Sequence, residues 1–165
     1  MAFHYKNVYW LWISAAVMLL DQVTKQLIVK NLGWFDVLPV VPHFNIVHMR
    51  NTGAAFSMLS NASPVFFILL GTAVSLGILW WLRKNPQGQT LVAVGLSMIL
   101  GGALGNVIDR ASRGYVVDFL DFYWSSWHFA AFNVADSAIS VGAGLLILDM
   151  LLEGRRARAA VKKVA

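Results

Sequence analysis

Two aspartates flank one loop of the sequence, and together they could carry out acid–base chemistry. Asp118 lies in the stretch YVVDFLDFYW, and Asp136 lies near the start of the apolar run FNVADSAISVGAGLLILDM. Carboxylates in or beside hydrocarbon are costly and tend to mark function. Two carboxyl groups held close together cannot both ionise easily, so they share a proton. One then acts as base on water while the other donates a proton, which suits the hydrolysis of a peptide bond.

Asp136 also has a structural explanation. If Asn133 is the N-cap of the following helix, Asp136 occupies the third helical position. A carboxylate there accepts hydrogen bonds from backbone N–H groups and complements the helix dipole. The structural and the catalytic role are compatible, because the same contacts would hold one carboxylate in place.

Other catalytic groups have less support in the sequence. There is no cysteine, no G-x-S-x-G motif, and no metal-ligand spacing among the histidines. We therefore expect neither a metal nor a cofactor. A Ser–Lys dyad formed by Ser57 or Ser60 with Lys25 stays open, although no motif supports it.

The composition places these residues in a membrane protein. Of the 165 residues, 58% are hydrophobic and only 13% are charged. Four apolar runs, at about residues 8–28, 64–82, 90–108 and 133–152, have the length needed to cross ~30 Å of hydrocarbon. These runs predict an all-α membrane protein, a four-transmembrane-helix bundle that forms one domain over residues 1–165.

The basic residues predict the orientation of the bundle. The net charge is +5, but the positive side chains are distributed by membrane side rather than gathered in one patch, so we expect no nucleic-acid partner. The short loop at Arg83 and Lys84 and the basic C-terminal tail favour the cytoplasm under the positive-inside rule. Both termini are then cytoplasmic, and residues 31–63 and 109–132 form outer loops.

Strand-like sequence interrupts both outer loops. Residues 35–49 are rich in β-branched and aromatic side chains but are broken by Pro39 and Pro42, which indicates short edge strands or a small curved sheet. YVVDFLDFYW has a similar composition, and Asn51-Thr52-Gly53 is typical of a turn. A small β-rich element therefore accompanies the helices.

Two spacings inside the helices predict contacts. Asp21 and Lys25 are four residues apart, as in a helical ion pair, which would let both exist near the outer interface. Gly101 and Gly105 form a GxxxG pair, a spacing that lets helix backbones approach closely.

Five blocks of the sequence resemble signal peptidase II, the bacterial lipoprotein signal peptidase family. They are DQVTK at 21–25, RNTGAAFS at 50–57, GGALGNVIDR at 101–110, VVDF at 116–119 and FNVADSAI at 132–139. The resemblance is specific, and the hydrophobic plan covers nearly the whole chain. It implies an aspartyl endopeptidase of the bacterial inner membrane, with its active site and a small β-rich cradle on the periplasmic side.

The resemblance also implies roles for individual residues and for partners. Asp118 and Asp136 match the catalytic pair. Supporting or substrate-binding positions are matched by Asn51, Gly53, Asn106, Arg110, Asn133, Asp21 and Lys25. The implied substrate is a prolipoprotein that is cut before a diacylglyceryl-modified cysteine, and the implied form is a monomer in membrane phospholipid.

Two other classes of function compete with this interpretation. A small proton-coupled exporter would also use membrane carboxylates, but it would keep them near the midplane of the bilayer. A structural assembly factor would need neither aspartate.

Overall fold

Within residues 5–53 and 62–164, the part of the chain described by this computed structural model, four helices are long and apolar enough to cross a membrane. They are α1 (Leu11–Asn31), α2 (Pro64–Lys84), α3 (Thr90–Arg113) and α4 (Val134–Val164). The predicted four-helix plan is confirmed. The first span begins later than predicted, because Tyr5–Trp10 forms a 3-10 helix ahead of α1.

Local sequence signals explain where the helices start and stop. Ser63 caps α2 by accepting a hydrogen bond from the N–H of Val65 at 3.2 Å, and Pro64 follows at the first helical position. α3 ends at Arg113, and the next residue, Gly114, is its C-cap. The φ of Gly114 is 82°, in the left-handed region that a glycine adopts without strain. This stop turns the chain directly into the strand that carries Asp118.

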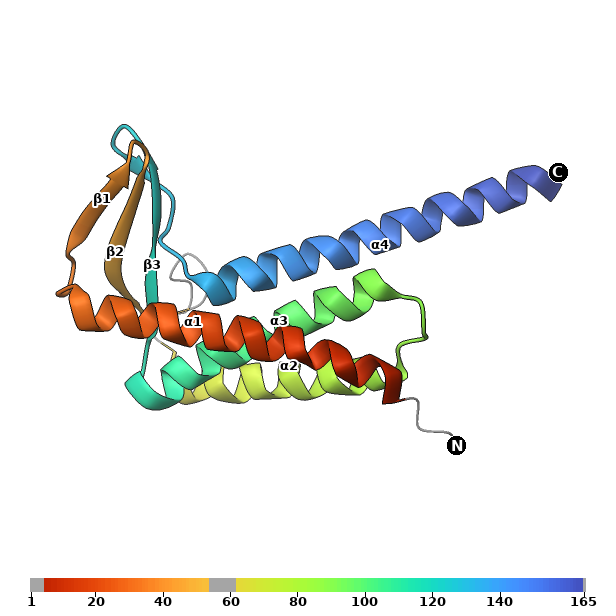
Figure 1. Cartoon of the computed structure of the whole chain (residues 1–165), viewed down its shortest axis with the longest axis horizontal. Coiled ribbons are helices and arrows are strands. Elements are labelled where there is room, and N and C mark those ends of the chain that lie inside the picture. The colour runs from red at the N-terminus through yellow and green to blue at the C-terminus, as the bar shows by residue number, and fades with distance from the viewer. Residues whose placement is uncertain (1–4, 54–61, 165) are drawn as a thin grey trace.

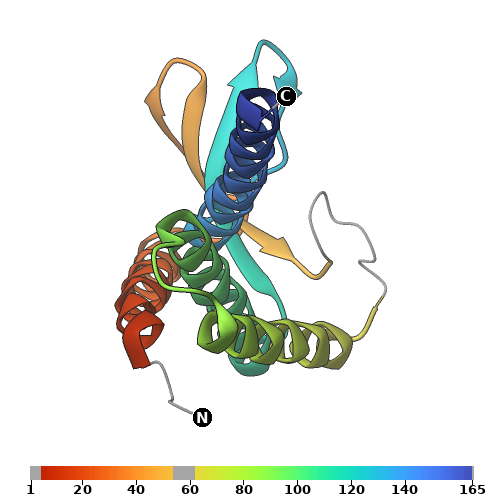
Figure 2. The ribbon, with the colours of Figure 1, turned by 90° about the vertical axis from the view of Figure 1, so that its right-hand side faces the viewer.

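α3 is the central helix of the bundle. Half of its most apolar window is buried, against about a fifth in each of the other three helices. α1, α2 and α4 all contact α3, and α4 then diverges from the bundle toward its C-terminus (Figures 1 and 2). Residues that project from α3 can therefore reach α1, the sheet and the start of α4.

Small residues allow this close packing. A Cβ on Gly101 would lie 2.7 Å from the carbonyl oxygen of Ser14, and one on Gly105 would lie 2.6 Å from Oδ2 of Asp21, so both glycines face α1. Gly102 faces the backbone of Ala135 at the start of α4. The packing role predicted for Gly101 and Gly105 is confirmed.

A four-stranded antiparallel sheet stands at one end of the bundle, and the 3-10 helix Tyr5–Trp10 and the C-terminal end of α4 lie at the other (Figure 1). Its strands are β1 (Val37–Val41), β2 (Phe44–Asn51), β3 (Val116–Trp124) and β4 (Trp127–His128), in the order β1-β2-β3-β4. The all-α label is thus only partly correct. The β-rich element predicted from residues 35–49 and from YVVDFLDFYW is confirmed, whereas the predicted start of the second outer loop at Asp109 is wrong, because α3 continues to Arg113.

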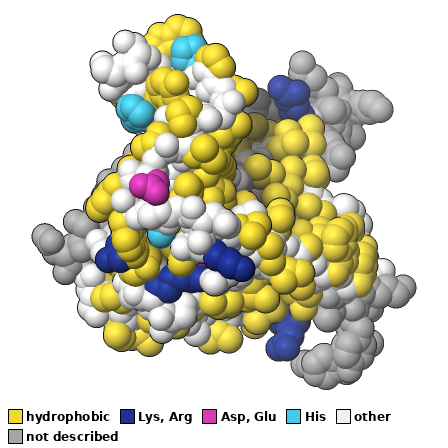
Figure 3. Space-filling model, turned by 60° about the vertical axis from the view of Figure 1, so that its left-hand side comes forward, with side chains coloured by type: hydrophobic (Ala, Val, Ile, Leu, Met, Phe, Trp, Pro, Cys, Tyr) yellow, Lys and Arg dark blue, Asp and Glu magenta, His cyan; other side chains and the backbone are white. Residues whose placement is uncertain are grey.

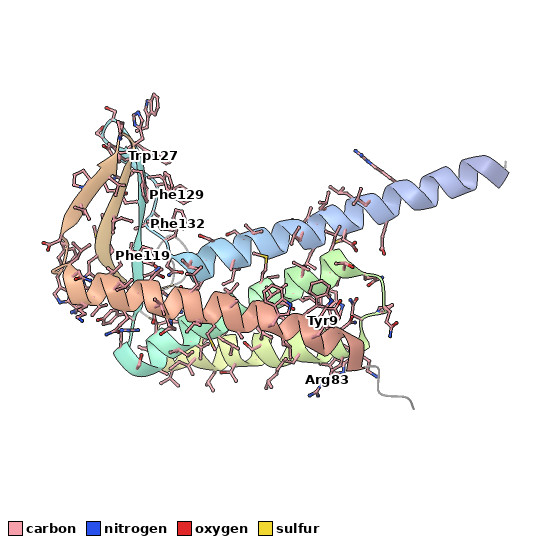
Figure 4. All side chains as sticks on the ribbon, in the orientation of Figure 1. Tyr9, Arg83, Phe119, Trp127, Phe129 and Phe132 are labelled. Atoms are coloured by element: carbon pink, nitrogen blue, oxygen red, sulfur yellow. The ribbon has the colours of Figure 1, made fainter. Side chains whose placement is uncertain are left out.

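Apolar side chains cover much of the surface of both sheet and helices (Figure 3). Tyr9 and Arg83 mark the end of the bundle away from the sheet, whereas Phe119, Trp127, Phe129 and Phe132 gather at the sheet end (Figure 4). Large exposed apolar patches indicate contact with a membrane or a partner.

Candidate active site

Asp118 lies in β3, opposite Met49 of β2, and is only 3% exposed. The side-chain amide of Asn133 donates a hydrogen bond to its Oδ1 at 2.7 Å, and the Asn51 side chain is also hydrogen-bonded to it. Burial and, next, the carboxylate of Asp136 raise the pKa of Asp118 to about 7, against the opposing effect of these two hydrogen bonds. Asp118 can therefore hold a proton near neutral pH.

Asp136 lies in the first turn of α4 and forms the predicted reciprocal cap with Asn133. The backbone N–H of Asp136 donates to Oδ1 of Asn133 at 2.9 Å, and the N–H of Asn133 donates to Oδ2 of Asp136 at 3.3 Å. This is a capping box. Because Asn133 also holds Asp118, one asparagine fixes both carboxylates relative to each other.

Asn106 of α3 orients Asp136 from the other side. Its Nδ2 donates to Oδ1 of Asp136 at 2.9 Å, and its Oδ1 accepts from Nζ of Lys25 at 2.9 Å. Lys25 also forms the predicted ion pair with Asp21, at 2.8 Å, but both side chains are fully buried in the bundle rather than exposed at an interface. Asp21 in turn accepts from the N–H of Ala135, which fixes the start of α4.

Asp109 is a buried member of this network that was not predicted from the sequence. Its Oδ2 lies 2.9 Å from Nζ of Lys25 and accepts from the N–H of Val117 at 3.2 Å, and its Oδ1 pairs with Arg113. The Asp109–Arg113 spacing of four residues on one helix could have signalled the pair, had the helix been expected to continue this far. Asp109 thereby ties α3 and α1 to the residue before Asp118.

Arg110 joins the site to the Asn51-Thr52-Gly53 turn. One guanidinium nitrogen, Nη2, donates to the carbonyl oxygen of Gly53, and Nη1 donates to that of Asn106 at 3.4 Å. The guanidinium also lies over the ring of Phe67, 4.7 Å from its centroid. The turn itself is confirmed by a hydrogen bond from the N–H of Gly53 to Oδ1 of Asn51 at 2.9 Å. Arg110 thus holds Asn51, through its turn, close to Asp118.

We expect Arg110→Lys to lower kcat/KM for peptide cleavage by roughly 10- to 100-fold, although it keeps the positive charge. A lysine has one point of attachment, so it cannot bridge the carbonyl oxygens of Gly53 and Asn106 or stack on Phe67 in the same way. The measurement is steady-state cleavage by purified variants. Arg83→Lys, at the far end of the bundle, is the matched control, and wild-type kinetics in Arg110→Lys would show that Arg110 is only a membrane-interface anchor.

Two cavities meet at these residues. The first cavity, of about 590 Å³, is lined by α3, by the first two turns of α4 and by residues 129–132, and it includes Asn106, Arg110 and Asp136. The second cavity, of about 400 Å³, lies against the sheet and includes Asp118. Asn51 lines both cavities, whereas Asp21 and Lys25 line neither of them. Of the predicted site residues, five line a cavity: Asn51, Asn106, Arg110, Asp118 and Asp136. The others line neither cavity and support the site: Gly53 in its turn, the buried Asn133, and the buried pair of Asp21 and Lys25.

The arrangement suits acid–base hydrolysis better than the Ser–Lys alternative. The ammonium of Lys25 is shared among Asp21, Asp109 and Asn106, so it is not directed at a serine in the described part of the chain. Ser57 and Ser60 lie outside the described residues. The two aspartates, in contrast, are each hydrogen-bonded by asparagine side chains and border a cavity.

Comparisons with known proteins identify the family of the chain. The sequence model of the family described as Signal peptidase (SPase) II matches residues 13–152. A lipoprotein signal peptidase of Alteromonas mediterranea is 48% identical over 147 residues, which cover 87% of this chain and 81% of the relative. One from Histophilus somni is 49% identical over 142 residues, or 84% of this chain and 86% of the relative.

A solved structure described as a bacterial membrane enzyme has the same fold. It superposes with a TM-score of 0.82 at 34% identity, over 92% of this chain and 91% of the other. Residues 13–152, which the family model matches, contain both aspartates, the asparagines that are hydrogen-bonded to them, and the buried network of Asp21, Lys25 and Asp109. By sequence and by fold, the chain belongs to the signal peptidase II family.

Proposed function

We propose that this chain removes signal peptides from prolipoproteins by hydrolysing the bond before a diacylglyceryl-modified cysteine. Family membership supports the reaction, and the paired placement of Asp118 and Asp136 supports an aspartic mechanism. The observation that carries the proposal is that Asn133 binds both carboxylates, one through its side-chain amide and one through the capping box.

In this mechanism the pair works with one shared proton, and we assign that proton to Asp118, a buried strand residue whose pKa is raised to about 7 by burial and by the nearby Asp136. Asp136, hydrogen-bonded by Asn106 and Asn133, is the ionised base and takes a proton from water. The water oxygen attacks the scissile carbonyl carbon while Asp118 donates its proton to the carbonyl oxygen. Asp136 then returns the proton to the leaving nitrogen of the cysteine as the C–N bond breaks. Asp118 takes back a proton from a hydroxyl group of the tetrahedral intermediate, which leaves a carboxyl product and restores the pair.

We further propose that the chain forms one membrane-embedded domain over residues 1–165 and acts as a monomer surrounded by phospholipid in the bacterial inner membrane. The Lys/Arg asymmetry supports cytoplasmic termini, which puts the sheet and the active site at the periplasmic face. A reporter fused after Lys84 that was found on the outer side would contradict this orientation.

The first cavity supports a substrate that carries lipid. It is lined by α4 from Asp136 to Val141, on a helix that is apolar enough to cross a membrane. An acyl chain could follow the helix while the peptide bond lies at the carboxylates. Arg110 and Asn106 supply the polar groups that fix the orientation of such a ligand.

The test is cleavage of a purified precursor by the purified chain in detergent or proteoliposomes. We expect a precursor with a diacylglyceryl-modified cysteine to be cut so that this cysteine becomes the new N-terminus, read by mass spectrometry. The same precursor without the lipid is the matched control, and its cleavage should be slower by at least about 100-fold, because binding energy from the lipid would be lost. Equal cleavage of both, or of neither, would contradict the proposal.

The exporter alternative fits the geometry less well. Asp118 lies on the sheet and Asp136 in the first turn of α4, so neither is near the midpoint of a spanning helix. Transporter sites are expected near that midpoint. An assembly factor would not need two carboxylates held together by shared asparagines.

A further inference from the structure

The two cavities lie on either side of one short segment, Phe129–Ala131, which we call the strap. All three strap residues line both cavities. Asp136 borders the first cavity and is absent from the wall of the second, whereas Asp118 borders the second and is absent from the wall of the first. Phe129 and Phe132 lie between the sheet and the start of α4 (Figure 4). The catalytic pair can therefore be approached from two separate sides.

The second cavity is lined by the sheet and the strap alone. Its walls come from β1, β2, β3, β4 and the strap, and no residue of the four helices contributes. The first cavity, in contrast, is built largely on α3 and α4. The side chain of His128, at the wall of the second cavity, is 53% exposed, so this cavity is open at the edge of the sheet rather than along a membrane-spanning helix.

Hydrogen-bonded polar side chains lie beside this opening, in the same cavity as Asp118. Nδ1 of His128 lies 2.9 Å from Oδ1 of Asp121, and Oδ2 of Asp121 accepts from Nδ2 of Asn45 at 2.9 Å. Asp121 is only 6% exposed and, like Asp118, lines the second cavity. The polar side chains of Asp121 and His128 thus form part of the wall of the cavity that the catalytic carboxyl of Asp118 also lines.

An irregularity in β3 brings Asp118 and Asp121 to the same cavity. Residues three apart in a regular strand point to opposite faces of a sheet, so Asp118 and Asp121 would be separated. The N–H groups of Phe119 and Leu120 both donate to the carbonyl oxygen of Phe132, at 3.0 and 2.8 Å, which is the hydrogen-bond pattern of a β-bulge. The bulge lets both aspartates line one cavity.

We propose that the second cavity is the route by which hydrolytic water reaches the catalytic pair, and that Asp121 and His128 are positioning residues that hold its polar wall. The inference rests on the proposed function. Each cleavage consumes one water, and a lipid-modified substrate in the first cavity would block entry from that side. A volume of about 400 Å³ holds on the order of ten waters at ~30 Å³ each.

Blocking the second cavity at its rim tests the proposal. Val37 of β1 is 53% exposed and lines this cavity, whereas Val40, on the same strand and 52% exposed, lines neither cavity. We expect Val37→Trp to lower kcat about tenfold or more with KM for the lipid-modified precursor unchanged, because binding through the first cavity is retained. Val40→Trp, which adds the same bulk to the same exposed strand, should behave as wild type.

A second pair of variants tests the polar wall itself. His128→Leu removes the hydrogen bond to Asp121 and makes the opening apolar, whereas His128→Asn keeps a group that can donate to the carboxylate. We expect a severalfold lower kcat for His128→Leu and near-wild-type kcat for His128→Asn. Wild-type kcat in both Val37→Trp and His128→Leu would overturn the water route.

A rise in KM at constant kcat in Val37→Trp would also overturn the proposal, because it would make the second cavity a binding site for the peptide. Failure of the proposed function has a different signature. In that case wild type and Val40→Trp would not cleave the precursor, whereas failure of the water route leaves their cleavage intact and removes only the effect of Val37→Trp.

Discussion

Asp118→Asn and Asp136→Asn are each expected to reduce cleavage of the lipid-modified precursor by roughly 10³-fold or more, while the protein stays folded. An amide has nearly the same shape as a carboxyl group, but it neither takes a proton from water nor donates one to the leaving group. The asparagine at 136 can still accept from the N–H of Asn133, so the helix cap survives. The measurement is kcat for each purified variant, with thermal unfolding in detergent as the check on folding.

Asp121→Asn is the matched control for these two variants. Asp121 is a buried aspartate of the same strand, and its amide analogue can still hydrogen-bond to Asn45 and His128. It should retain most of the wild-type activity. Turnover by Asp118→Asn or Asp136→Asn within tenfold of wild type, with unchanged stability, would contradict the aspartic mechanism.

The pH dependence of the wild type gives the same mechanism a second test. Burial and the nearby Asp136 raise the pKa of Asp118 to about 7, so Asp118 is protonated below that pH and ionised above it. If Asp118 is the proton donor, kcat falls as the pH rises through about 7. Because the two carboxyl groups interact, the pKa observed in kcat belongs to the Asp118–Asp136 pair rather than to one residue. A kcat that stays level from pH 6 to pH 9 would place the proton donor elsewhere.

Much of the site could be predicted because its signals are local. The Asn133–Asp136 capping box and the Asp21–Lys25 pair are defined by spacings of three and four residues, and both contacts form. The strands were predictable from β-branched and aromatic residues broken by prolines. Hydropathy identified the helices, since every backbone polar group in hydrocarbon must be satisfied within the helix.

The remainder depends on contacts between residues that are distant in sequence. Asp109 was predicted to lie in a loop because its neighbourhood is polar. It lies instead in the last turns of α3 and forms an ion pair with Lys25, which lies 84 residues earlier in the chain. The bulge that brings Asp118 and Asp121 to one cavity depends on Phe132, a residue beyond the strand. The division of the site by the strap likewise follows from how α4 meets the sheet, which no local spacing encodes.

Lys25→Met is expected to lower the free energy of unfolding by about 3–5 kcal/mol, because it removes a cation from between two buried carboxylates. Lys25, Asp21 and Asp109 are all fully buried, and the ammonium of Lys25 lies within 2.9 Å of both carboxylates and of Oδ1 of Asn106. Methionine has a similar length and fills the space, so the loss reports charge and hydrogen bonding rather than a cavity. Denaturant or thermal unfolding in detergent measures the change.

Lys84→Met is the control for loss of a lysine, because Lys84 is exposed at the end of α2, and its effect should lie within ~0.5 kcal/mol. The double variant Lys25→Met/Asp21→Asn separates the causes. Asp109 keeps Arg113 as a partner, whereas Asp21 loses its only ion-pair partner among the described residues, so neutralising Asp21 should recover part of the lost stability. A double variant that is less stable by the full sum of the two single effects would show that Lys25 and Asp21 act independently, and would contradict the buried pair as the structural support of the first turn of α4.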